Sequence, residues 1–171
     1  MLTLKLLGNI VTIALLVLLQ AFVFSKINFN HIATPYIYIL FILLYPAFRN
    51  RYVFLLLCFL LGWGVDLFED TGGIHAFASL TIGFLSKHII RMVSGTKFFE
   101  LEEFRYSDFN AGQWIIYTAL MVFIHHFLLF LMESLSFSNF GGIMLRTLSC
   151  SAFTLLFVYF YLILFRKRAE R

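Results

Sequence analysis

Charge is scarce in this chain. Of its 171 residues only 13% are charged, whereas 61% are hydrophobic and 23 are Phe. A soluble globular domain carries roughly 25% charged residues, so the composition excludes an ordinary soluble fold and indicates an integral membrane protein. The chain also has only two Pro, and no linker rich in Pro, Gly or Ser divides it. We therefore expect residues 1–171 to form a single polytopic membrane domain.

Signatures of catalysis are also lacking. The sequence contains no nucleophile elbow, no phosphate-binding loop and no HExxH motif. Its two cysteines, Cys58 and Cys150, fall inside apolar runs, where each behaves as a small apolar residue. The acids and the histidine at 66–75 fit no strong metal-ligand template. We expect neither an enzyme nor a protein with a cofactor or a metal.

Long apolar runs are what the chain does have. A helix needs about 20 apolar residues to cross the hydrocarbon core, and such runs predict transmembrane helices at 6–24, 52–68, 73–90, 112–132 and 143–165. The run at 36–48 is shorter. Pro35 before it suits a first helical turn, while Pro46 distorts or ends a helix. We interpret this run as a tilted or half-buried second span; the alternative is a re-entrant segment, which would put the termini on opposite sides.

The distribution of Lys and Arg favours six spans. With both termini cytoplasmic, eleven basic residues fall on the inner side and two on the outer side, as the positive-inside rule requires. The net charge of +4 then reflects topology and attraction to anionic lipid, and gives no case for nucleic-acid binding. The outer residues are Lys26 and Arg146, and the inner ones are Lys5, Arg49, Arg51, Lys87, Arg91, Lys97, Arg105, Arg166, Lys167, Arg168 and Arg171.

Residues 62–83, GWGVDLFEDTGGIHAFASLTIG, predict a transmembrane hairpin with an acidic tip. Asp66, Glu69 and Asp70 are costly in hydrocarbon, so we expect the chain to reach water here and turn back. A glycine pair after the acids permits a tight reversal, and glycines in the helices allow close packing. The turn glycines are Gly72 and Gly73, and the helix glycines are Gly62, Gly64 and Gly83.

Polar residues also occur within the predicted spans. Asn9, Thr12 and Gln20 share one face of the first helix, a pattern typical of hydrogen bonding between membrane helices. His125 and His126 are adjacent and point about 100° apart, so they cannot bind one ion as an i, i+4 pair would. We interpret both as neutral imidazoles hydrogen-bonded inside the bundle, with a proton relay or a metal site as the alternative.

Two further features concern the ends of the spans. Glu133 closes the fifth predicted span and Arg146 opens the sixth, and we predict an ion pair between them. On the cytoplasmic side, residues 94–110 mix acidic, basic and aromatic residues. This mixture indicates an amphipathic interfacial segment or a docking surface, or a loop whose aromatic side chains lie at headgroup depth.

The order of these features resembles the MreD family, rod shape-determining membrane proteins of bacteria, and particularly its short members from Bacteroidetes-type organisms. The resemblance rests on the polar-striped first helix ending near Gln20, on ATPYIYILFILLYP at 33–46 and on LLGWGVDLFEDTGGIHAFASLTIGFL at 60–85. Length, span number and short loops agree over essentially the whole chain. One departure is Tyr36, which stands where many members carry an acid directly after the proline, so no role of that acid transfers here.

The resemblance implies a non-enzymatic component of the cell-elongation machinery in the bacterial inner membrane. Members bind the single-span protein MreC and connect cytoplasmic MreB filaments to RodA-type glycosyltransferases and class B penicillin-binding proteins. It also implies six helices in a fold similar to the substrate-binding (S) components of energy-coupling-factor transporters. We hypothesise that an MreC-like partner binds around Asp66, Glu69, Asp70, Gly73 and His75.

The rival interpretation is a small-molecule-binding subunit of a membrane transporter. It would use the same six helices and a ligand pocket near the hairpin and the polar face of the first span. Transport sites usually place several convergent polar groups in one cavity, and this chain offers mainly Asn9, Gln20, His125 and His126.

Overall fold

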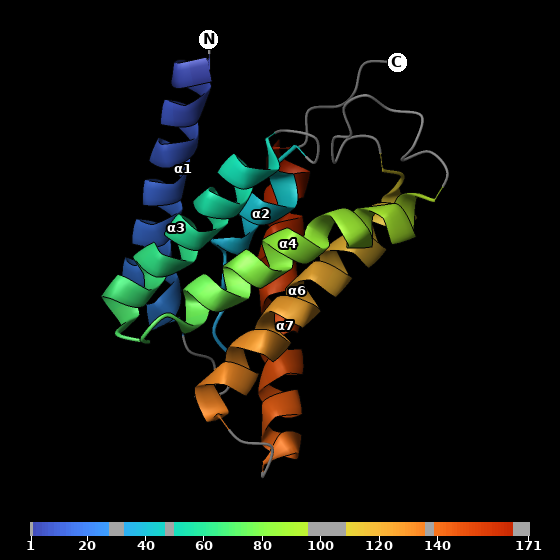
Figure 1. Ribbon diagram of the computed structural model, residues 1–171. Helices are drawn as coiled ribbons and strands as arrows, with labels where there is room; N and C mark the ends of the chain where they lie inside the picture. Colours follow the sequence, from blue (N-terminus) through green and yellow to red (C-terminus); the bar gives the residue numbers. More distant parts are fainter. Residues whose placement is uncertain (1, 28–32, 47–49, 96–108, 136–138, 166–171) are drawn as a thin grey trace.

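All regular elements described by the computed structural model are helices, as Figure 1 shows. The described residues are 2–27, 33–46, 50–95, 109–135 and 139–165. Within them five helices are long and apolar enough to cross a membrane, which confirms an all-α, multi-pass membrane protein. The elements are α1 (Leu2–Phe22), the 3₁₀ helix η1 (Phe24–Lys26), α2 (Ile39–Leu44), α3 (Arg51–Glu69), α4 (Ile74–Ser94), α6 (Ala111–Ser134) and α7 (Phe140–Phe165).

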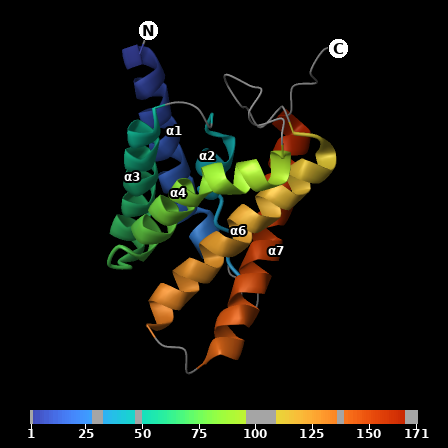
Figure 2. The same cartoon turned by 45° about the vertical axis from the view of Figure 1, so that its right-hand side comes forward.

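The long helices pack in a series around α2. Helix α1 packs on α3, α3 on α4, α4 on α6, and α6 on α7. In both Figure 1 and Figure 2, α2 lies between the side formed by α1 and α3 and the side formed by α6 and α7. Its residues from Ile39 to Leu43 are all buried. The shortest α-helix of the described chain therefore occupies the centre of the bundle.

The second passage differs from the helix predicted at 36–48. Residues 34–36 are not helical, and α2 has only six residues, a length of about 9 Å that cannot cross a bilayer alone. The prediction that Pro35 begins a helix is wrong, because the helix starts at Ile39. The prediction for Pro46 is confirmed: the helix ends at Leu44, and Tyr45 before the proline is extended, since a residue preceding proline is disfavoured in the helical region.

The segment that contains α2 nevertheless carries the chain from one end of the molecule to the other. In Figure 1 the start of α1 and the end of α7 lie at the same end, and the turn between α3 and α4 lies at the opposite end, here called the hairpin end. A re-entrant second segment would have left these two ends of the chain on opposite sides. The arrangement therefore agrees with a second passage that combines non-helical backbone and a short helix.

Glycine brings α3 and α4 into backbone contact. A Cβ atom added at Gly62 would lie 2.3 Å from the carbonyl oxygen of His75, and one added at Gly83 would lie 2.7 Å from Cys58 Sγ. At Gly64 the nearest atom would be Val17 Cγ2 at 3.0 Å, on α1. The predicted role of these glycines in close packing is confirmed, because side chains at these positions would separate the helices.

Replacing Gly62 by Ala should destabilise the protein by about 1–3 kcal/mol or more, since the new methyl group overlaps backbone that cannot move independently. Unfolding in a mixed detergent titration, followed by circular dichroism, measures the change. Gly141→Ala is the matched control, because nothing lies within 4 Å of a Cβ atom there. Equal stability of the two variants would contradict the backbone contact.

Candidate functional site

The candidate site is built around Asp66, near the end of α3. Its Oδ1 accepts a hydrogen bond from the His75 N–H at 3.0 Å, and its Oδ2 accepts one from the Ala76 N–H at 2.8 Å. These amides belong to the first turn of α4, whose N–H groups have no partner within the helix. Gly73, at the N-cap, has no side chain to supply one. Asp66 therefore caps a helix other than its own and places a carboxylate where the helix dipole favours it.

The acidic tip predicted at the hairpin does not include Asp66, whose side chain is buried, whereas Asp70 is exposed. Asp66 is only 6% exposed, and two side chains of the hairpin also contact its carboxylate. The Thr71 hydroxyl donates to Oδ1 at 2.5 Å, and His75 Nδ1 lies 3.0 Å from the same oxygen. A buried carboxylate is tolerated when hydrogen bonds satisfy its oxygens. The hairpin itself provides those bonds.

His75 connects Asp66 to Glu69. Its Nε2 lies 3.7 Å from Glu69 Oε2, and its buried ring is flanked by Tyr36 and Tyr38, with centroid distances of 5.7 Å and 5.9 Å. Three of the five residues hypothesised to bind a partner, Asp66, Glu69 and His75, thus meet in one cluster. Their contacts are with the protein itself.

Asp70 and Gly73 lie in the turn between α3 and α4, outside the cluster of Asp66, Glu69 and His75. The backbone reverses through Asp70, Gly72 and Gly73, with φ of 53°, 65° and 99°, which confirms the tight reversal predicted for the glycine pair. Asp70 is exposed. Together with Gly73 it lines a groove between α3 and α4, on the side of these helices that faces away from the rest of the bundle. These two residues remain accessible to a binding partner.

Gln20 links the cluster to the second passage. Its Nε2 donates to Ser25 Oγ at 3.3 Å and to the Pro35 carbonyl oxygen at 3.2 Å, and its Oε1 accepts from the Ile37 N–H at 2.9 Å. The Ser25 hydroxyl in turn donates to Glu69 Oε1. The fully buried side chain of Gln20 therefore satisfies backbone that is not helical.

Helix α7 holds the same backbone from the other side. The Tyr36 N–H donates to Thr154 Oγ1 at 2.9 Å, and the Thr34 N–H lies 3.5 Å from Cys150 Sγ. Thr154 also lies 3.3 Å from His126 Nε2. Because His126 Nδ1 lies 2.7 Å from the Val122 carbonyl oxygen, which only accepts, Nδ1 carries a proton and Nε2 can accept the Thr154 hydroxyl.

The two adjacent histidines serve different contacts, as predicted from their divergent directions. His125 Nε2 lies 2.7 Å from the Tyr38 hydroxyl, whereas His126 contacts Thr154, and both rings are fully buried. Asn9 is not near either of them. With Thr12 it lines a separate hollow beside α2, so the polar face of the first helix is divided between two places.

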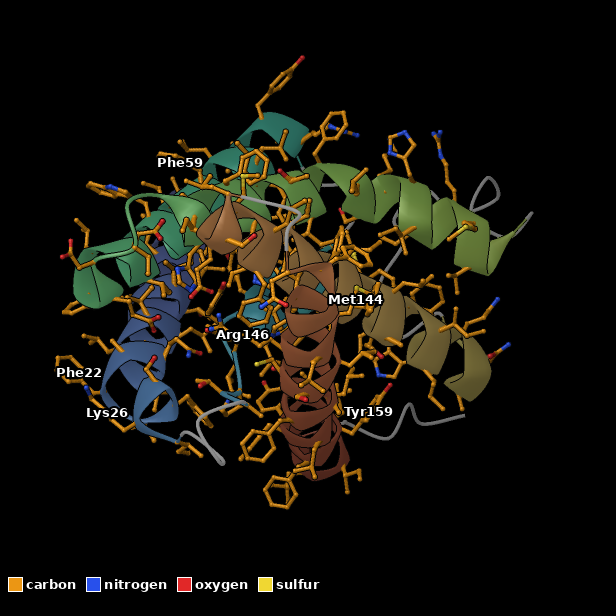
Figure 3. The ribbon with its side chains drawn as sticks, turned by 90° about the horizontal axis from the view of Figure 1, so that it is seen from below. Phe22, Lys26, Phe59, Met144, Arg146 and Tyr159 are labelled. Carbon is orange, nitrogen blue, oxygen red and sulfur yellow. The ribbon has the colours of Figure 1, made fainter. Side chains whose placement is uncertain are left out.

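Glu133 and Arg146 form the predicted ion pair, with Arg146 Nη1 3.1 Å from Glu133 Oε1. The guanidinium also lies over the Phe130 ring, 4.5 Å from its centroid. Figure 3, which views the molecule from the hairpin end, labels Arg146 on α7. Because the side chains are 48% and 44% exposed, the pair contributes about 0–1 kcal/mol.

Several predictions fall on residues that the structure does not describe. The proposed amphipathic segment at 94–110 is described only at its ends, and residues 166–171 lie outside the described ranges. Among described residues no group of three or more His, Cys, Asp or Glu could hold a metal ion. The chain matches no family model, no curated protein and no solved structure.

Replacing Gln20 by Leu should destabilise the protein by about 1–3 kcal/mol, because the Pro35 carbonyl and the Ile37 N–H lose their buried partner. Thr12→Val is the control on the same helix, since the Thr12 hydroxyl returns to the Gly8 carbonyl of its own helix. A detergent unfolding titration compares the two. The assignment fails if Gln20→Leu is as stable as Thr12→Val.

Asp66→Asn should also destabilise the protein by about 1–3 kcal/mol. Each carboxylate oxygen of Asp66 now accepts from one backbone N–H, and the NH₂ group of Asn, a donor, would leave one of these N–H groups without an acceptor. Asp70→Asn should change stability by less than about 0.5 kcal/mol, since the side chain is exposed and Asn tolerates the left-handed conformation. Thermal unfolding in detergent measures both. An unchanged midpoint for Asp66→Asn would contradict the capping role.

Proposed function

We propose that the protein is a non-enzymatic scaffold of the bacterial cell-elongation machinery, which maintains rod shape by binding an MreC-like single-span protein and helping to organise peptidoglycan synthesis. The proposal rests on the resemblance to the MreD family over the length of the chain. The most specific part of that resemblance, residues 60–85, folds as one interlocked hairpin. Such a unit presents a fixed surface to a partner.

The observation that carries the proposal is how the polar groups of the bundle are used. Gln20 binds the backbone of the second passage, His126 contacts Thr154, and His125 contacts Tyr38. Asn9 lines a hollow elsewhere. A transport site needs several polar groups that converge on one ligand. Gln20, His125 and His126, three of the four side chains on which the transporter interpretation depends, instead form internal contacts of the fold, which favours a scaffold.

The proposed location is the bacterial inner membrane, with both termini cytoplasmic. The excess of basic residues on the loops of one side supports this orientation, as does the position of the start of α1 and the end of α7 at one end of the bundle. The hairpin end then faces outward, toward the MreC-like partner. The opposite end faces MreB filaments, and RodA-type glycosyltransferases and class B penicillin-binding proteins would join the same assembly.

Affinity purification of the tagged protein from gently solubilised native membranes, with mass spectrometry, tests this function. We expect an MreC-like protein and wall synthases, enriched over a tagged unrelated multi-pass protein expressed at the same level. Recovery of ATPase subunits, or of a bound small molecule without wall proteins, would reject the scaffold and favour the transporter.

A further inference from the structure

The outward sides of α3 and α4 enclose a groove of about 560 Å³ at the hairpin end. Its walls are apolar, and its floor near the turn consists of small residues. Figure 3 shows Phe59, at the far end of the groove, on the edge of the molecule away from α7. The walls are formed by Phe59, Trp63 and Leu67 from α3 and by Phe77 and Leu80 from α4.

The groove follows from the contact between α3 and α4. Gly62 brings the α3 backbone against the carbonyl of His75, and the large side chains that line the groove come from both helices. Trp63 and Phe77 remain 48% and 46% exposed. Exposed apolar residues alone are ordinary in a membrane protein. A concave surface between two closely packed helices is a shape into which a third helix fits.

One end of the groove is acidic. Asp66 and Asp70 both line it, but the two carboxylates differ. Asp66 is saturated by the N–H groups of α4, Thr71 and His75. Asp70 is exposed and forms no ion pair with any residue that the structure describes. A carboxylate at the rim of an apolar groove is complementary to a single cationic side chain.

We propose that this groove binds the transmembrane helix of the partner, and that a Lys or Arg at the outer end of that helix pairs with Asp70. The inference rests on the proposed scaffold function and adds the binding surface and the chemistry of its occupant. The groove follows α3 from Phe59 to Asp70, a stretch of helix about 16 Å long, or three turns. The groove thus accommodates the outer half of a membrane-spanning helix.

Packing and one ion pair would provide the binding free energy. Lipid offers no hydrophobic drive between helices, so close contact with the aromatic walls and with the small floor residues Gly73 and Ala76 must supply most of it. The Asp70 pair fixes the depth and direction of the incoming helix, because a cation at its other end would meet no carboxylate in the groove. The ion pair therefore sets the position of the partner helix along the groove, and close packing provides most of the binding affinity.

Site-specific photo-crosslinking in native membranes tests the groove. A photoreactive phenylalanine analogue is placed at Phe77 or Leu80, and at Leu156 on α7 as an exposed apolar control; Leu156 is 60% exposed, more than either test position. We expect the first two positions, but not the third, to crosslink to the transmembrane segment of the MreC-like protein. The crosslinked peptide, identified by mass spectrometry, should come from a helix with Lys or Arg at its outer end.

The charge is tested by Asp70→Asn, which should lower the crosslinking yield at Phe77 about fivefold, the equivalent of one exposed ion pair. Replacing the partner's basic residue by Gln should have the same effect, with no further loss in the double variant. Glu133→Gln is the control, since it removes a different exposed acid at the same end. A thermal midpoint equal to that of the unmodified protein shows that Asp70→Asn is folded.

The other outcomes overturn the inference in distinguishable ways. If the MreC-like protein co-purifies but crosslinks only at Leu156, the groove is wrong and the scaffold function stands. Crosslinks at Phe77 to lipid alone, or to a second copy of this chain, also reject a partner helix. If no MreC-like protein is recovered at all, both the groove and the proposed function fail.

Discussion

The fold depends on hydrogen bonds supplied to a stretch of backbone that is not helical. Within a bilayer no water is available for N–H and C=O groups, so irregular backbone survives there only when protein surrounds it. Here Gln20 from α1 binds the Pro35 carbonyl and the Ile37 N–H, and Thr154 from α7 accepts a hydrogen bond from the Tyr36 N–H. The five long helices surround this passage and shield its non-helical backbone from lipid.

The same principle explains the acidic residues of the hairpin. A carboxylate in an apolar helix is costly by itself, and so are the free N–H groups at the start of a helix. Here the carboxylate of Asp66 accepts hydrogen bonds from the free N–H groups at the start of α4, so each compensates the cost of the other. The polar contacts then extend through His75, Glu69 and Ser25 to Gln20, so the α3–α4 hairpin and the second passage belong to one structural unit.

The sequence predicts the long helices well, because apolar runs and the absence of charge are local properties. It also predicts the Glu133–Arg146 pair, since these residues flank a short connection. It fails at Pro35 and Asp66 for a common reason: their partners are distant in sequence, and an isolated acid is most simply explained by water. No signal in the sequence relates Thr154 or Cys150 to the residues at 34–36. For Gln20 the sequence predicts a hydrogen bond to another segment of the bundle, but it gives no sign that the partners are the non-helical backbone groups of Pro35 and Ile37.

The capping of α4 by Asp66 has a consequence for how the chain enters the membrane during synthesis. While α3 is the last helix to have left the ribosome, its carboxylate has no amides to bind and opposes release into lipid. Once the first turn of α4 forms, the charge is compensated. The two helices are therefore suited to leave the translocation channel together, as a pair joined by the two-glycine turn.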